Sequence, residues 1–304
     1  MNPDSHPLVV SVCYIRIAAS ELHASARFAA DIFGLQRVAE KNGEIAFRSD
    51  NRFRTLSISN GSSHGLSHGL SHGLSDGSSI GIEAWDEAAL DQIETRLTKN
   101  GFVVSRATAG DCRLRYVQAA LLARDGSGNS IDLVARPTQS GRRYFPSRDA
   151  GITELHGVGI RSTDMARDLQ FWKELGAEVS DWVGDIAYLR IDGLHHRIAL
   201  YPAKRHGLLY AAFEVETLDN IMQNGYFMQE RQIKIVQGPG REPCSKQMFL
   251  HVEGPDGIIF SYVNGMKEIG PVRRPARQFP LAPQSLCDWG SEAKDVPELS
   301  AGVN

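Results

Sequence analysis

The chain lacks the long apolar runs and the excess of basic residues that mark two large classes of protein. No apolar stretch in its 304 residues approaches the roughly 18 residues of a membrane-spanning helix. Lys and Arg total 33 against 36 Asp and Glu, a net charge of −3, so no basic surface for nucleic acid is indicated. The first residues also lack the basic and apolar regions of a signal peptide. We therefore expect a cytoplasmic protein that binds neither membranes nor nucleic acid.

Cysteine is scarce as well. The four cysteines, at positions 13, 112, 244 and 287, are too far apart in the sequence to form a zinc-binding pair. Secreted scaffolds held by disulfides place cysteines much more densely than this. We expect four reduced thiols.

Four segments of the chain follow one order: a strand, a helix, then two or three strands. The first has a strand over 9–17, a helix from Ser20 to Gly34, and strands over 36–41, 44–48 and 54–59. Ser20 is the expected N-cap of this helix, and Gly34 is its expected end. The second has a strand over 80–85, a helix that starts at Asp86 and stops at Gly101, and strands over 102–106, 116–123 and 129–134.

The third and fourth segments repeat the first and second. Ser162 and Gly176 are fourteen residues apart, as are Ser20 and Gly34. The turn at 125–128 precedes a strand over 129–134, much as the turn at 254–257 precedes a strand over 258–263. Such self-similarity indicates two similar halves of two modules each.

The repeat of modules predicts that the chain has three parts. Residues 1–140 form an N-terminal half without an active site, residues 141–270 form a C-terminal half that carries the active site, and residues 271–304 form a tail. Pro137, Gly141 and Pro146 mark the joint between the halves. The tail is rich in proline and arginine, and we expect its isolated aromatic residues to pack it onto the domain.

One low-complexity segment, residues 63–74, reads Ser-His-Gly-Leu three times. Histidines four residues apart would share one face of a helix, but the glycines between them disfavour a helix. We predict a surface loop rather than a metal site. Replacing His64, His68 and His72 with serine should leave activity and melting temperature nearly unchanged, as measured by thermal unfolding; a large drop in either would show that the loop packs or binds something.

The paired modules, with His156 opening the third, resemble the vicinal oxygen chelate superfamily over roughly residues 8–265. Within it they are most similar to the two-domain type I extradiol dioxygenases, such as dihydroxybiphenyl and catechol 2,3-dioxygenases. The resemblance implies an α+β fold of four βαβββ modules, in which each half is a cupped mixed sheet with helices outside. It also implies that only the C-terminal half keeps a metal site and that the substrate is a small aromatic compound. We also expect a homo-oligomer.

Family members hold ferrous iron with two histidines and a glutamate, which leaves positions open for substrate and dioxygen. His156 matches the first of these ligands. The second ligand position, in the strand 209–215, falls on Tyr210, and the glutamate position, in 259–262, falls on Ser261. Two of three iron ligands are therefore replaced, and we expect no tightly bound metal and no other cofactor.

Other positions match the family's chemistry rather than its metal. His196, in the pair His195-His196, matches the acid–base histidine. His251 stands where the family has a catalytic tyrosine, and Glu242 falls near a further histidine of a loop. His206 lies in a loop where it could contact substrate at the mouth of the site.

The alternation of side chains along strands, taken without the family resemblance, predicts the same group of inward-facing residues in the cupped sheet. Leu209, Ala211, Phe213 and Val215 should face the helix layer and leave Tyr210 inward, and Leu250 and Val252 should leave His251 inward. The same rule puts His156 on a face with Val158 and Ile160, and His196 on a face with Ile198 and Leu200. His195 should point away from the cup and serve a structural role.

These residues predict an enzyme of aromatic-compound catabolism that works without metal. His196, His251 and Tyr210 would be catalytic, and His156, Ser261, Glu242 and His206 would bind the substrate, a phenol, a catechol-like compound or its ring-derived ketone. Histidine titrates near neutral pH, and a tyrosine can donate to a developing oxyanion.

Three alternatives remain open from the sequence. Because three imidazoles can hold zinc or iron, His156, His196 and His251 could form a relocated site for Fe(II) or another divalent metal in a ring-cleaving dioxygenase. The chain could instead bind an aromatic ligand without turnover, or the histidines could belong to a filled core.

Overall fold

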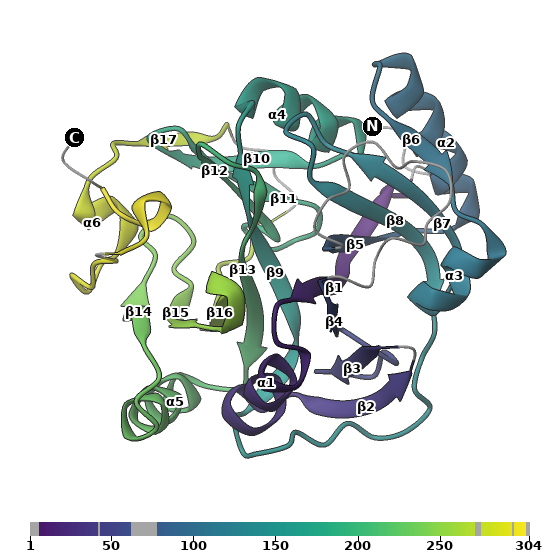
Figure 1. The fold of residues 1–304 in the computed structure, drawn as a ribbon. Helices are drawn as coiled ribbons and strands as arrows, with labels where there is room; N and C mark the ends of the chain where they lie inside the picture. The colour runs from purple at the N-terminus through teal and green to yellow at the C-terminus, as the bar shows by residue number, and fades with distance from the viewer. Residues whose placement is uncertain (1–5, 42, 62–77, 271–274, 294, 302–304) are drawn as a thin grey trace.

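Two mixed β-sheets, of eight and nine strands, form the body of the molecule in the computed structural model (Figure 1). The structure describes residues 6–41, 43–61, 78–270, 275–293 and 295–301. The Ser-His-Gly-Leu repeats lie outside these described residues, so the prediction about them stays a prediction.

The first sheet is built from two modules. The first module comprises β1 (Val9–Ala19), α1 (Leu22–Arg27), β2 (Gln36–Lys41), β3 (Glu44–Arg48) and β4 (Leu56–Asn60), and α1 continues as a π-helix over Phe28–Phe33. The second comprises β5 (Ser79–Ala84), α2 (Glu87–Lys99), β6 (Val104–Arg106), α3 (Ala109–Arg115), β7 (Val117–Arg124) and β8 (Ser130–Pro137).

The second sheet repeats this plan and gains an edge strand from the tail. The third module comprises β9 (Ile152–Ser162), α4 (Met165–Glu174), β10 (Glu178–Val183), β11 (Ile186–Arg190) and β12 (Ile198–Pro202). The fourth comprises β13 (Gly207–Val215), α5 (Leu218–Glu230), β14 (Ile235–Arg241), β15 (Met248–Glu253) and β16 (Ile259–Asn264). The tail supplies β17 (Arg277–Phe279), α6 (Pro283–Leu286) and a 3₁₀ turn at Pro297–Leu299. A second 3₁₀ turn, Pro255–Gly257, lies between β15 and β16.

The strand orders are related by the module repeat. They run β2-β3-β4-β1-β5-β8-β7-β6 and β14-β15-β16-β13-β9-β12-β11-β10-β17. In every module the first strand pairs parallel with the last, and the two modules of each half join through an antiparallel pair, β1 with β5 and β9 with β13. The predicted α+β fold of four βαβββ modules in two cupped halves is confirmed.

Local sequence signals account for most helix ends. The Asp86 side chain accepts from the Ala89 N–H and caps α2, as predicted. Gly34 ends the first helical segment in a left-handed conformation, with φ of 103°. The predicted cap at Ser20 is wrong: the N-cap is Glu21, and Ser20 donates its N–H and hydroxyl to Asp256 of the other half instead.

One helix within the four modules was not predicted. A reciprocal capping box between Thr108 and Asp111 begins α3, which is only seven residues long and has a single buried side chain, Cys112. So short a helix shows no hydrophobic period in the sequence, and only its capping pair could have revealed it.

The main hydrophobic core is shared by both halves and is formed by strand and helix residues of each. Phe33, at the end of the first helical segment, stacks on Tyr262 of β16 with ring centroids 4.2 Å apart, and it meets Phe213 and Phe260 at 5.2 and 5.1 Å. The Tyr262 hydroxyl donates to the Phe33 carbonyl oxygen at 2.7 Å. The opposite, concave face of each sheet carries a separate buried cluster. No helix among the described residues is long and apolar enough to cross a membrane.

Candidate functional site

The concave face of the second sheet is filled by aromatic and polar side chains, and we call this cluster the C-terminal cup. Its apolar members come from seven strands, the loop between β14 and β15, and the tail: Val183, Ile186, Tyr188, Ala199, Tyr201, Leu209, Tyr210, Ala212, Val236, Cys244, Phe249, Ile259, Val263, Cys287, Ala293 and Leu299. His156, His196, Glu242, His251 and Ser261 are also buried. The tail therefore closes over the site that the sequence placed here.

His156 reaches the cup because β9 is irregular at this point. Gly157 pairs with Ala212 of β13, and Leu155 pairs with Phe213, so His156 is the extra residue of a β-bulge. The prediction that His156 shares a face with Val158 and Ile160 is therefore wrong, since those two side chains lie in the main core. A bulge reverses the alternation, and sequence alternation alone cannot show one.

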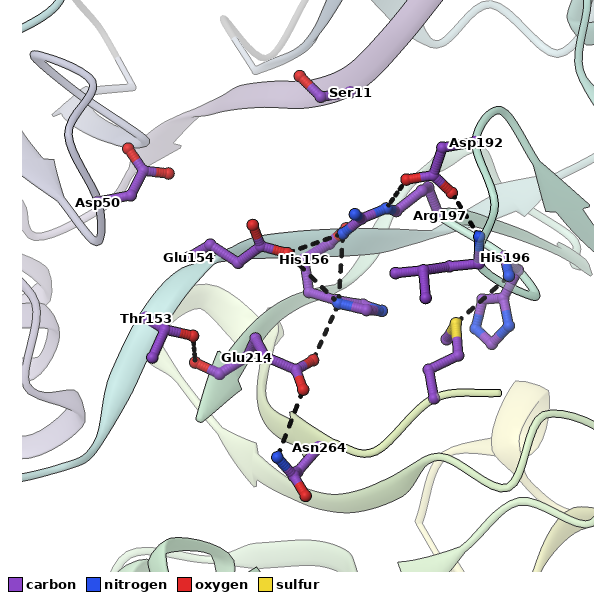
Figure 2. Close-up of polar contacts among 12 residues, drawn as sticks. Ser11, Asp50, Thr153, Glu154, His156, Asp192, His196, Arg197, Glu214 and Asn264 are labelled. Atoms are coloured by element: carbon purple, nitrogen blue, oxygen red, sulfur yellow. Dashed lines mark hydrogen bonds and ion pairs between the residues drawn. The ribbon is translucent and has the colours of Figure 1, made fainter. Parts of the chain in front are cut away.

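Both ring nitrogens of His156 have partners, and the side chain is only 2% exposed. Its Nε2 accepts from the Gln247 amide at 2.9 Å. Its Nδ1 lies 3.0 Å from Glu214 Oε2, and Arg197 donates to the His156 carbonyl oxygen at 3.0 Å. Figure 2 shows His156 between Glu154 and Glu214 with Arg197 alongside. The residue is held in a polar network at the edge of the cup.

Tyr210 and His251 face the cup as predicted. The Tyr210 ring lies across Gly159 of β9, where an added Cβ would be 2.3 Å from the ring, so only glycine fits beneath it. His251 stacks on Tyr210 and on Phe249, with ring centroids 5.5 and 4.6 Å away, and its Nδ1 is 2.7 Å from the Ser261 hydroxyl. A second bulge turns Leu209 into the cup, against the prediction that it faces the helix layer.

His196 enters the cup from the turn before β12 rather than from the strand. Its ring packs on Tyr188 at 4.7 Å, whereas Ile198 and Leu200 lie in the main core, so the predicted shared face is wrong. The turn rotates the side chain out of the strand alternation that starts at Ile198. Burial lowers the pKa of His196 well below its usual value, so the imidazole is neutral near pH 7.

His195 does not point away from the site, contrary to the prediction. Its Nδ1 is 3.1 Å from Nδ1 of His196, and its Nε2 is 2.8 Å from Asp181. The pKa of Asp181 lies below its usual value. Burial raises this pKa, but hydrogen bonds from Arg277 of the tail and from His195 lower it by a larger amount. An ionised Asp181 accepts from Nε2–H of His195. When His195 is neutral, its Nδ1 accepts from Nδ1–H of His196, and Nε2 of His196 is then an acceptor.

Glu242 lies where that acceptor points. Its Oε2 is 4.0 Å from Nε2 of His196 and accepts from the Ser245 hydroxyl at 2.5 Å. Burial raises the pKa of Glu242 to about 7. A carboxylic acid and a neutral imidazole thus face each other, and such environment-driven pKa values are typical of acid–base sites. From the sequence, Glu242 was expected only to bind the substrate.

Several phenols surround this pair. Tyr188, Tyr201 and Tyr210 are buried, and burial raises the pKa of each well above its usual value, so all three are neutral donors. The first two were missed by the sequence analysis, although both lie on the alternating face of β11 and β12. His206 is exposed in the turn between β12 and β13 and lies outside the buried cluster.

The donors at the family's metal positions do not fit a ferrous ion. The Nε2 lone pair of His156 is engaged by Gln247, Tyr210 is a neutral phenol, and the Ser261 hydroxyl is bonded to His251. A ferrous ion prefers imidazole together with a charged carboxylate. Within the described ranges, no group of three or more His, Cys, Asp and Glu side chains is arranged to hold a metal ion. The structure therefore does not bring His156, His196 and His251 together as the alternative site requires.

Known proteins resemble this chain in both sequence and structure. Residues 154–262 match the model of the Glyoxalase/Bleomycin resistance protein/Dioxygenase superfamily. The 1,2-dihydroxynaphthalene dioxygenase of Sphingobium xenophagum is 21% identical, covering 93% of this chain and 97% of that protein. An iron-dependent extradiol dioxygenase of Rhodococcus jostii is 20% identical, covering 83% and 88%. Homoprotocatechuate 2,3-dioxygenase from Arthrobacter globiformis superposes with a TM-score of 0.82 at 20% identity, covering 99% of this chain and 94% of that chain. The chain thus has the fold of the two-domain extradiol dioxygenases.

Proposed function

We propose that the C-terminal cup is a metal-independent acid–base site that acts on a phenol, a catechol-like compound or its ring-derived ketone. The observation that carries this proposal is the Glu242 carboxyl, with a pKa of about 7, 4.0 Å from the neutral imidazole of His196. A group whose pKa is near the working pH is best suited to give and take a proton. The relatives that act on aromatic diols support the substrate class.

The proposed division of labour follows from the contacts. His196, held by His195 and Asp181, presents Nε2 as a proton acceptor. Glu242 carries the proton that is returned to the substrate. Tyr210 and His251, stacked on each other, would hold the substrate oxygen on which charge develops. Isomerisation or bond cleavage next to a carbonyl needs no more than these transfers.

Metal analysis tests the metal-independent part. Because Tyr210 and Ser261 are neutral donors, protein purified anaerobically should contain well below one iron per chain. Added Fe(II) should not produce cleavage of 2,3-dihydroxybiphenyl or 3-methylcatechol. As a matched control, the Tyr210→His and Ser261→Glu double variant supplies an imidazole and a carboxylate and should raise iron occupancy. One iron per chain in the wild type, with yellow ring-fission product, would overturn the proposal.

A second function, binding of an aromatic ligand without turnover, is favoured by one observation. The cup is packed by three tyrosines and by the tail residues Cys287, Ala293 and Leu299. A ligand that stabilises the chain but is recovered chemically unchanged would support this function over catalysis. The division at residues 140 and 270, a cytoplasmic location and homo-oligomerisation remain proposals beside it.

A further inference from the structure

The concave face of the first sheet carries its own polar site, which the proposed function does not use. Three arginines gather there: Arg16 on β1, Arg54 just before β4 and Arg115 at the end of α3. Arg16 and Arg54 are buried, Arg54 at 3% exposure. We call these residues, with Tyr14, Glu44 and Asp132, the arginine cluster.

The carboxylates around the arginine cluster are shared unevenly among the three arginines. Arg115 has its own carboxylates, with Nε 2.9 Å from Asp132 and Nη1 3.7 Å from Asp111. Arg16 and Arg54 share a single carboxylate, Glu44, at 3.1 and 2.8 Å. Burial raises the pKa of Glu44, but Arg54 and Arg16 together lower it by a larger amount, so Glu44 is ionised. Glu44 is thus the one carboxylate that Arg54 contacts among the described residues, and Arg54 shares it with Arg16, whereas Arg115 contacts two.

Only one of the three guanidinium nitrogens of Arg54 donates hydrogen bonds to described residues. Nη1 donates to Glu44 at 2.8 Å and to the Ser57 hydroxyl at 2.6 Å. Nε and Nη2 are buried and have no hydrogen-bond partner among the described residues. These two N–H groups form one straight edge of the guanidinium, the edge that binds the two oxygens of a carboxylate side by side. The Nε of Arg16 likewise has no partner in the described part of the chain.

Two aromatic rings pack near the same guanidinium group. Its central carbon lies 4.5 Å from the Tyr14 ring and 5.4 Å from the Tyr116 ring. Tyr116 packs in turn on Phe53, with ring centroids 4.4 Å apart. Aromatic carbon therefore lies next to the Arg54 guanidinium, which suits the body of a small organic acid better than a hydrated inorganic anion.

We propose that the N-terminal half binds a small organic monocarboxylate through the Nε–Nη2 edge of Arg54. Two in-plane carboxylate oxygens match the two free donors of Arg54. A phosphate dianion would cost more to dehydrate in this buried position than a monocarboxylate. This site is separate from the C-terminal cup and stands whether or not the cup is catalytic.

Calorimetric titration of the full chain with benzoate tests the proposal. Benzoate should bind saturably at one site per chain, whereas the neutral benzamide and inorganic phosphate should not. Arg54→Lys keeps the charge but loses the two-donor edge, and it should weaken benzoate binding on the order of tenfold or more. Arg52→Lys, two residues away at an ion pair with Asp50, is the matched control and should bind benzoate like the wild type.

Three results would overturn the site. They are absence of benzoate binding to the wild type, equal binding of benzoate and benzamide, and unchanged binding by Arg54→Lys. If Arg54→Lys does not fold, the half-buried Tyr116 offers a second variant. Tyr116→Ala removes one aromatic wall and should weaken benzoate binding, and unchanged affinity in that variant would refute the site equally.

Discussion

Glu242→Gln is expected to lower turnover on the order of a hundredfold or more, because it removes the proton that the site returns to its substrate. His196→Ala should lose a similar factor, and the two losses should not add, since the groups act as one pair. Turnover would be measured against a panel of phenols, catechols and ring-derived ketones. Glu253→Gln, an exposed carboxylate paired with Lys234, is the matched control and should retain activity.

The same substitution has a readout that needs no substrate. The pKa of Glu242 is about 7 in the folded chain, against 4.5 as its ordinary value. The folded state therefore binds more protons than the unfolded state between these values, and stability falls as pH rises through this window. Glu242→Gln removes this loss, so its free energy of unfolding at pH 8 should exceed that of the wild type by roughly 3 kcal/mol.

Below pH 4 the difference should vanish, because the carboxyl is protonated in both states. Asp125, whose pKa burial also raises to about 7, titrates in the same window in both proteins and cancels from the difference. Denaturant unfolding at several pH values measures it. A stability difference that does not change with pH would show that the pKa of Glu242 is the same in the folded and unfolded chains, and the proposed acid would be lost.

Phe33→Ala is expected to cost about 3–5 kcal/mol of stability, the range for a large buried aromatic side chain. Phe33 is fully buried, and its ring packs on three aromatic residues of the other half: Phe213, Phe260 and Tyr262. The variant removes a principal contact between the halves, so the thermal transition should also lose cooperativity.

Phe145→Ala is the control for this experiment. Phe145 is 57% exposed, and its loss should change stability by less than about 0.5 kcal/mol. Equal melting temperatures for the Phe33→Ala and wild-type chains would mean that the two halves do not depend on the shared core.

The architecture could be derived from the sequence because its signals are local and repeated. Apolar alternation, the cap at Asp86 and the left-handed glycine at Gly34 each act over a few residues, and the module repeat supplies the order of the strands. The same local rules turned His251 into the cup correctly, because β15 pairs regularly with β16 there, and they also held for Tyr210, since the bulge in β13 redirects Leu209 instead.

Tertiary structure decided what the site contains. The bulge at His156 reverses a strand alternation, the turn before β12 redirects His195 and His196, and the tail covers the cup. The acid character of Glu242 and the free edge of Arg54 depend on burial among segments far apart in the chain. Burial and pairing are properties of the assembled fold, since a carboxyl or guanidinium keeps its ordinary behaviour until distant residues exclude water from it.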